Sequence, residues 1–207
     1  MRKTGIKYLI GIDEVGRGPL AGPVCLGFCI FELKNKTKIY KILSGIKDSK
    51  KLSEKQRLEW QLKIKNLEKQ DLIKAETVFG SAKLIDQKGI SKVITNVITR
   101  TVTRELNNLG ANPDQFTILL DGGLKAPKKF KNQRTIIKGD EKEKIISVAS
   151  IVAKIKRDNL MVRLSKKYPK YSFEEHKGYG TKKHIQVIKK YGLSDIHRDT
   201  FTKNIII

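Results

Sequence analysis

The sequence predicts an α/β protein in which helices pack on a mixed β-sheet. Apolar runs of strand length, such as residues 8–12, 24–33 and 116–120, alternate with longer segments whose apolar residues recur at helical spacing. The first runs lie close together, as in an antiparallel meander, whereas the later ones are separated by helices. A chain of 207 residues can form one sizeable core, so we expect residues 1–207 to be a single domain with the last ~40 residues as a helical extension.

The first predicted strand ends in two adjacent carboxylates, Asp13 and Glu14. Acids at the end of a buried strand are costly unless something positive lies against them. In the turn that follows, Gly16 and Gly18 allow the backbone to approach a ligand closely, and Arg17 offers a fork of donors suited to phosphate. A bare Asp-Glu pair could simply face water, but the glycines favour a metal or an anionic partner.

The next part of the chain alternates between turns, helices and strands. Residues 34–38 are rich in lysine and are expected to form the surface turn of a hairpin. A helix should begin at Ser53, because Ser53 and Gln56 have the spacing of a capping box. Residues 72–80 have the pattern of a strand, and residues 81–109 carry apolar side chains at helical spacing, which predicts a long helix.

Two further acids follow strand-like segments. Asp121 ends the strand of residues 116–120, and Asp140 follows a short strand at residues 135–137. Each has a purely structural explanation, since an Asp-Gly pair is a common turn and an aspartate is a good N-cap. Because ligand sites in open α/β sheets lie at the carboxyl ends of strands, we expect both acids to converge with Asp13.

The charge of the chain favours a polyanionic partner. It has 44 Lys and Arg against 21 Asp and Glu, a formal net charge of +23, which points to nucleic acid first and an anionic membrane second. Its apolar runs are too short to span a bilayer, and no signal peptide is expected before the first strand. Cys25 and Cys29 share one strand and indicate a reduced, cytoplasmic protein without a zinc site.

Four separated motifs resemble the type 2 ribonucleases H, and bacterial ribonuclease HII in particular. They occur in family order over nearly the whole chain, and together they imply a ribonuclease H-like mixed sheet flanked by helices with a small C-terminal helical extension. Gly89 stands where the family usually has an Asn-Ile step, a departure that bears on a substrate contact and not on the fold. The motifs are Asp13-Glu14 with Gly16-Arg17-Gly18, the run Asp48-Ser49-Lys50-Lys51-Leu52-Ser53, the run from Ser147 to Asp158, and His176-Lys177-Gly178-Tyr179-Gly180-Thr181 with the closing His197-Arg198 and Phe201.

The resemblance also implies the roles of individual residues. Four acids match the catalytic, metal-binding carboxylates of the family, and oxygen ligands without cysteine or histidine suit Mg²⁺ or Mn²⁺, with two ions expected per site when substrate is bound. Tyr179 matches the tyrosine that recognises the nucleotide after the ribonucleotide, although a tyrosine between two glycines could be ordinary packing. Lys50 and Lys51 could equally be a solvated helix start, and no histidine, His176 included, is given a catalytic role. The expected sites are Asp13, Glu14, Asp121 and Asp140 for catalysis and metal, and Gly16, Arg17, Gly18, Ser49, Lys50, Lys51 and Tyr179 for substrate.

The expected function is that of a metal-dependent endoribonuclease. It would hydrolyse the RNA strand of RNA/DNA hybrids and incise on the 5′ side of ribonucleotides embedded in duplex DNA, leaving a 3′-hydroxyl and a 5′-phosphate. These nucleic acids are its expected partners, and a monomer is expected. One alternative is ribonuclease HIII, which usually carries an additional N-terminal substrate-binding domain. The other is a non-catalytic hybrid-binding protein, which four carboxylates facing phosphate would disfavour.

Overall fold

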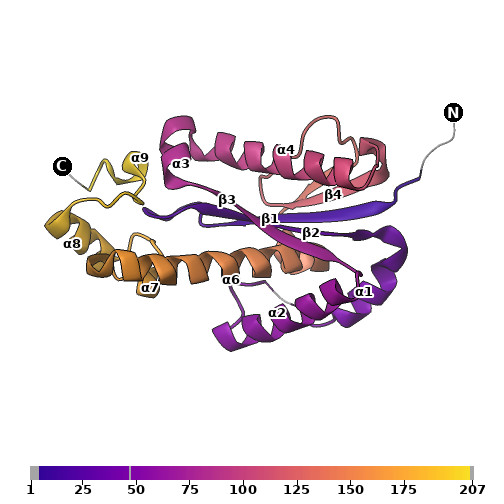
Figure 1. Ribbon diagram of the computed structural model, residues 1–207, viewed down its shortest axis with the longest axis horizontal. Helices are drawn as coiled ribbons and strands as arrows, with labels where there is room; N and C mark the ends of the chain where they lie inside the picture. The colour runs from indigo at the N-terminus through magenta and orange to yellow at the C-terminus, as the bar shows by residue number, and fades with distance from the viewer. Residues whose placement is uncertain (1–4, 47, 206–207) are drawn as a thin grey trace.

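The protein has three layers, with a five-stranded sheet between two layers of helices (Figure 1). The computed structural model describes residues 5–46 and 48–205, so residues 1–4, 47 and 206–207 of the expected domain lie outside the described residues. None of the helices in the described ranges is both long and apolar enough to cross a bilayer. One face of the sheet is covered by α3 (Ala82–Lys88) and α4 (Ile90–Asn108), and the other by α6 (Lys144–Lys167) and α2 (Glu54–Lys69).

The sheet is mixed, which confirms the predicted fold class. Its strand order is β3-β2-β1-β4-β5, with antiparallel pairing among the first three strands and parallel pairing of β1 with β4 and of β4 with β5. The parallel register sets Ile12 beside Leu120, so Asp13 and Asp121 continue two neighbouring strands at the same level. The strands are β1 (Tyr8–Val15), β2 (Val24–Glu32), β3 (Lys74–Gly80), β4 (Phe116–Asp121) and β5 (Gln133–Ile136).

The lysine-rich segment after β2 is helical, which corrects the prediction of a hairpin turn. A short 3₁₀ turn, η1 (Leu33–Asn35), leads directly into α1 (Lys36–Ile42). Ile39 and Leu43 are both fully buried in the cluster that contains Phe31. Residues four apart lie on one face of a helix, so helical geometry is what allows both to reach this core.

Between residues 53 and 109 the helices agree with the prediction at the start of α2 and differ from it at Gly89. The predicted capping box is present at the start of α2, where Ser53 Oγ accepts from the Gln56 amide at 3.2 Å and Gln56 Oε1 accepts from the Ser53 amide at 2.9 Å. The single helix predicted over residues 81–109 is instead divided at Gly89, whose φ of 79° and ψ of 145° are far from helical values. Because glycine tolerates positive φ, this departure from the family pattern also sets the break.

Glycines on the two central strands let α6 lie against the sheet at very short range. A Cβ atom on Gly11 would fall 2.6 Å from a carbonyl oxygen of α6, and one on Gly27 would fall 2.0 Å from another. A larger residue at either position would push the helix away. The close approach brings Ser150 of α6 to the strand that carries Asp13.

The C-terminal segment forms the helical extension that the sequence predicts. In Figure 1 it lies beyond the end of the sheet at which β1 finishes. A small core of its own joins it to the rest, because Phe173 and Tyr171 pack with Ala21 and Met161. A β-bridge between Ala21 and His197 adds a backbone connection. The extension comprises η3 (Pro169–Tyr171), α7 (Phe173–His176), α8 (Lys182–Tyr191) and α9 (Asp199–Thr202).

Candidate active site

Two of the four predicted carboxylates lie within β1 rather than after its end, because the strand continues to Val15. Consecutive side chains of a strand point to opposite faces, so Asp13 and Glu14 leave the sheet in different directions. Asp13 faces α6, where the Ser150 hydroxyl lies close enough to favour the ionised carboxylate and so lower its pKa. Glu14 pairs with Arg17, whose Nη1 donates to Glu14 Oε1 at 3.0 Å.

The other two carboxylates are joined by a backbone contact. Asp121 is the last residue of β4, and its Oδ1 accepts a hydrogen bond of 2.6 Å from the amide of Gly139. Gly139 opens α5 (Gly139–Lys142), so Asp140 lies inside this one-turn helix and is not the N-cap that its position suggests. The N-cap of α5 is Lys138, in a left-handed conformation.

Asp121 is the point on which the four acids converge. Its charge raises the pKa of Asp13, of Glu14 and of Asp140, which places it within electrostatic reach of all three. Lys50 faces the same cluster, and its pKa is raised by Asp140, Asp13 and Asp121, although burial opposes this. The structure thus brings the four sequence-predicted carboxylates together around the ends of β1 and β4.

Burial is the main cost of holding these acids ionised. It raises the pKa of Asp13 well above its usual value, and the Glu14 and Asp121 charges add to this while the Ser150 hydrogen bond opposes it. Burial also raises the pKa of Glu14, against the effect of Arg17. Burial and the neighbouring Asp48 carboxyl raise the pKa of Asp140 to about 6. A cluster of this kind is relieved by positive charge from outside the chain.

Two buried oxygens show where such a charge would fit. Among the described residues, Glu14 Oε2 and Asp140 Oδ2 are buried without a hydrogen-bond partner, and Lys50 Nζ lies 3.8 Å from the second. An all-carboxylate donor set suits Mg²⁺ or Mn²⁺. No group of three or more acidic, cysteine or histidine side chains in residues 5–46 and 48–205 could hold an ion by itself.

The glycine turn is held from behind by two arginines that the sequence analysis did not select. The guanidinium groups of Arg157 and Arg198 are fully buried and donate six hydrogen bonds, all to backbone carbonyls. Gly16 has φ of +88°, and a Cβ atom there would fall 2.1 Å from Arg157 Nε, so only glycine fits. Gly18 has open space around it, which leaves its backbone accessible to a ligand.

Two other supporting residues, Asp48 and Ser150, were also missed. Asp48 is buried, accepts from the Lys50 amide at 2.8 Å through Oδ1, and lies close enough to Asp140 to raise the pKa of that carboxyl. Ser150 lies near Asp13, whose pKa it lowers, and its hydroxyl oxygen is 2.8 Å from that of Ser49. Both fall inside runs that match the family, which was the available signal. A buried aspartate or serine has no distinguishing pattern of its own.

The predicted substrate-binding side chains differ in their accessibility. Ser49, which was predicted to bind substrate, is fully buried, and its hydroxyl faces that of Ser150 in the interior. Lys50 is exposed, with 70% of its side chain accessible, and Lys51 pairs with Glu141 at 2.9 Å. Tyr179 is 41% exposed, with the Arg157 guanidinium 5.7 Å from the centre of its ring.

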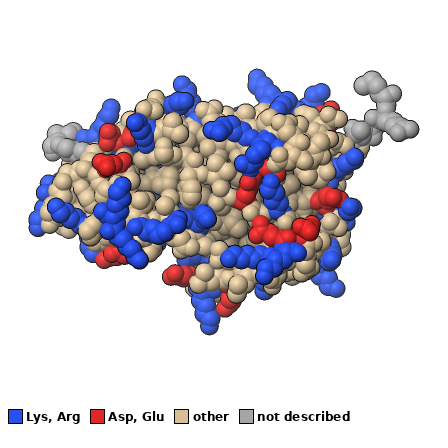
Figure 2. All heavy atoms as spheres, viewed as in Figure 1, with Lys and Arg blue, Asp and Glu red and all other residues tan. Residues whose placement is uncertain are grey.

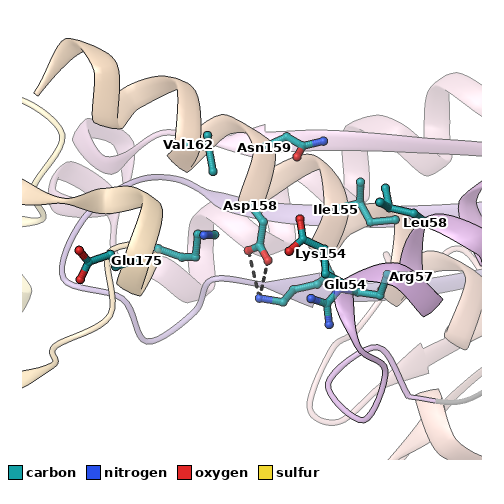
Figure 3. A pocket seen from close by; sticks show the side chains of 10 residues that line it. Glu54, Arg57, Leu58, Lys154, Ile155, Asp158, Asn159, Val162 and Glu175 are labelled. Carbon is teal, nitrogen blue, oxygen red and sulfur yellow. Dashed lines mark hydrogen bonds and ion pairs between the residues drawn. The ribbon is translucent and has the colours of Figure 1, made fainter. Parts of the chain in front are cut away.

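The surface around the site suits a polymer better than a small molecule. Figure 2 shows lysines and arginines spread over one whole face, with the acidic residues in a few smaller groups. A cavity of about 270 Å³ lies between α2, α6 and α7, but none of the four carboxylates lines it (Figure 3). Its walls pair opposite charges, as in the ion pair of Lys154 with Asp158 at 2.8 Å, so it has no strong preference for phosphate.

Comparison with known proteins supports the resemblance. The model of the family described as Ribonuclease HII matches residues 10–204. Ribonuclease HII of Caldicellulosiruptor bescii is 42% identical over 205 residues, covering 98% of this chain and 90% of the relative. The crystal structure of the ribonuclease H2 from Pyrococcus horikoshii OT3 has a TM-score of 0.65 at 25% identity and covers 96% of each chain. Bst-RNase HIII in complex with Mn²⁺ shares the fold, with a TM-score of 0.64 at 18% identity, and this chain covers 65% of its length.

Proposed function

This chain belongs to the ribonuclease HII family, and from that premise we propose that it is an endonuclease that depends on divalent metal ions. It hydrolyses the RNA strand of RNA/DNA hybrids. It also incises on the 5′ side of ribonucleotides embedded in duplex DNA. Membership makes it a ribonuclease H type of enzyme. The observation that carries the finer proposal is the pair of unpartnered buried oxygens of Glu14 and Asp140, within one carboxylate cluster beside an accessible glycine turn.

The cluster would act through bound cations. Asp13, Glu14, Asp121 and Asp140 would hold Mg²⁺ or Mn²⁺, which when bound supplies an activated water and stabilises the leaving oxygen of a phosphodiester displacement. The similarity of fold to a ribonuclease HIII solved with Mn²⁺ supports this choice of ions. Lys50, exposed and facing the cluster, balances the charge of a phosphate held there. The predicted product ends are a 3′-hydroxyl and a 5′-phosphate.

The glycine turn offers a way to read the 2′-hydroxyl that distinguishes RNA from DNA. Arg198 binds the carbonyl oxygens of Gly16 and Arg17, at 2.7 Å and 2.9 Å, so both point into the protein. In a trans peptide unit the N–H points away from the carbonyl oxygen. The amides of Arg17 and Gly18 therefore point away from Arg198, where they can donate to a sugar oxygen. Tyr179, exposed beside this turn, is proposed to contact the next nucleotide.

One assay tests this function directly. A duplex with a single ribonucleotide and a continuous hybrid are incubated with Mg²⁺, Mn²⁺ or EDTA, and the cut position is read on a sequencing gel. We expect cleavage on the 5′ side of the ribonucleotide with either ion and none in EDTA. Binding of both substrates without cleavage under any ion would support the non-catalytic alternative. Monomeric state and cytoplasmic location stay predictions.

A further inference from the structure

All three histidines of the chain meet in one buried cluster beside Tyr179. They come from α7, α8 and the segment before α9, and none is more than 8% exposed. His176 and His184 stack with ring centres 4.2 Å apart, and His184 Nε2 lies 3.0 Å from His197 Nε2. Phe173 packs against all three rings. The function proposed above assigns this cluster no role.

The hydrogen bonds determine which nitrogen of each ring carries its proton. The Ser194 amide donates to His197 Nδ1 at 2.9 Å, so His197 is protonated on Nε2 and donates to His184 Nε2. His184 must then be protonated on Nδ1, from which it donates to the Tyr179 carbonyl at 2.9 Å. The result is a directed chain of hydrogen bonds that runs from Ser194 through two neutral rings to Tyr179.

The third ring serves the same segment from the other side. The Gly178 amide donates to His176 Nδ1 at 3.2 Å, so His176 is protonated on Nε2 and donates to the Tyr171 carbonyl at 2.8 Å. The Tyr179 amide donates to the His176 carbonyl at 2.9 Å. The backbone on both sides of Tyr179 is therefore attached to the histidine cluster.

The same segment is also attached to the glycine turn. The Gly178 carbonyl accepts from the Leu20 amide at 2.8 Å, and the Lys177 carbonyl accepts from Arg157 at 3.0 Å. Gly178 has φ of +86°, and a Cβ atom there would fall 2.4 Å from the Ala21 carbonyl oxygen. Tyr179 is thus held between the turn that would read the ribose and the histidines.

We propose that His184 and His197, with His176, are positioning residues that fix Tyr179 beside the glycine turn and so set the preference for an RNA-to-DNA step. The inference rests on the function proposed above and adds specificity-determining residues to it. Protonation of the rings would break the network, because two N–H groups would face one another between His184 and His197. Burial lowers the pKa of His184 and of His197 to about 4, which keeps both rings neutral at ordinary pH. The charged groups that face the cluster are Glu174, Glu175 and Lys183 near His176, and Asp199 near His197.

The test uses the fact that asparagine places its amide near the position of Nδ1, whereas glutamine places it near Nε2. His184→Asn can still donate to the Tyr179 carbonyl, but His184→Gln cannot. At the other ring the order reverses, because His197→Gln can still donate to His184 Nε2 and His197→Asn cannot. If each histidine only filled space, the glutamine variant, which is larger, would be closer to wild type than the asparagine variant at both positions.

The readout is the ratio of kcat/KM on a single-ribonucleotide duplex to kcat/KM on a continuous hybrid. We expect this ratio to fall about tenfold or more in His184→Gln and His197→Asn, because small misplacements of a contact residue are costly, and to stay near wild type in the other two variants. Adding Tyr179→Ala to His184→Gln should lower the ratio no further than Tyr179→Ala alone. Tyr171→Phe is the matched control, since it removes a partly buried 3.0 Å hydrogen bond to the Gly192 carbonyl within the same core. It should lower the melting temperature without changing the ratio.

The outcomes separate this inference from the proposed function. If the wild-type protein cleaves both substrates and all four histidine variants keep the wild-type ratio, the positioning role is overturned and the proposed function stands. Circular dichroism showing that His184→Gln and His197→Asn are both unfolded overturns it in favour of a purely structural role. A wild-type protein that cleaves neither substrate overturns the proposed function and this inference together.

Discussion

Asp140→Asn should make the metal-free protein more stable, although it removes a residue proposed to be essential. Asp140 is 4% exposed, one of its oxygens lacks a hydrogen-bond partner, and burial with the Asp48 carboxyl raises its pKa from 3.8 to about 6. At 1.36 kcal/mol per pH unit, a rise of this size sets an upper limit of roughly 3 kcal/mol on the stability lost at neutral pH, because Lys50 and solvent screen part of the charge. An amide of nearly the same shape carries no such cost. For a chain of this length the gain corresponds to a melting temperature higher by up to roughly 6–12 °C.

The sign of the pH dependence follows from the direction of the shift. Between about pH 4 and pH 6 the folded protein retains a proton on Asp140 that the unfolded chain has lost, so the stability of the wild type falls as pH rises through this window. The advantage of Asp140→Asn should therefore be full at pH 7.5 and nearly absent at pH 4. The difference in unfolding free energy between the two proteins at each pH cancels the contribution of the other titrating groups.

The change in unfolding free energy is measured by urea denaturation of both proteins. Each protein is unfolded in EDTA and again in millimolar Mg²⁺ or Mn²⁺. Cations that bind only the folded state raise its stability by mass action, and loss of one ligand should shrink that rise. Glu59→Gln is a matched control, because it neutralises an exposed carboxylate on α2 and should change stability by less than about 0.5 kcal/mol. An Asp140→Asn protein that is less stable than wild type in EDTA would refute the reasoning.

Three further predictions concern catalysis and binding. Asp13→Asn and Asp121→Asn should each abolish cleavage while hybrid binding, measured in Ca²⁺ or EDTA, stays intact or tightens, and near-normal cleavage would remove that carboxylate from the site. Replacing Lys50 and Lys51 with alanine should lower affinity and flatten the dependence of log K on log salt, whose slope is about −0.9 per neutralised phosphate on duplex DNA; an unchanged slope would make both lysines ordinary solvated residues. Tyr179→Ala should lose most cleavage at a single ribonucleotide at an unchanged melting temperature, whereas Tyr179→Phe, which keeps the ring, should lose much less.

The sequence was sufficient for the elements that carry the carboxylates. Asp121 directly follows the buried residues of β4, and the parallel register with β1 brings Asp13 to the same level, as strand-end reasoning anticipates. The capping box at Ser53 is likewise local, because its donors and acceptors lie three residues apart. The strand ends and the capping box depend on neighbours in the sequence, so pattern alone could locate them, whereas the meeting of Asp13 and Asp121 also depends on the pairing of two strands that are distant in the chain.

The residues that the sequence did not identify depend on contacts between distant segments. Arg198 lies more than 170 residues from the carbonyls of Gly16 and Gly22 that it binds, and nothing in its local pattern marks it as buried. Ser49 was predicted to bind substrate, and sequence alone gave no sign that its hydroxyl is buried against Ser150 of α6. The histidine cluster requires three elements of the extension to fold against one another, so the chain order shows no sign of it.

Unbalanced buried charge of both signs flanks the glycine turn, and this arrangement explains why stability and function should conflict here. On one side the charge of Asp121 adds to the burial that raises the pKa of Asp13, Glu14 and Asp140. On the other side Arg157 and Arg198 bond only to carbonyl oxygens in the described part of the chain. Burial lowers the pKa of Arg198 to about 10, so its positive charge persists at neutral pH. A buried charge without a counter-ion destabilises a fold, and apolar replacements are often more stable. Bound cations would relieve the carboxylate side, whereas the arginines stay in place behind the turn, so we expect the free protein to gain stability when metal binds.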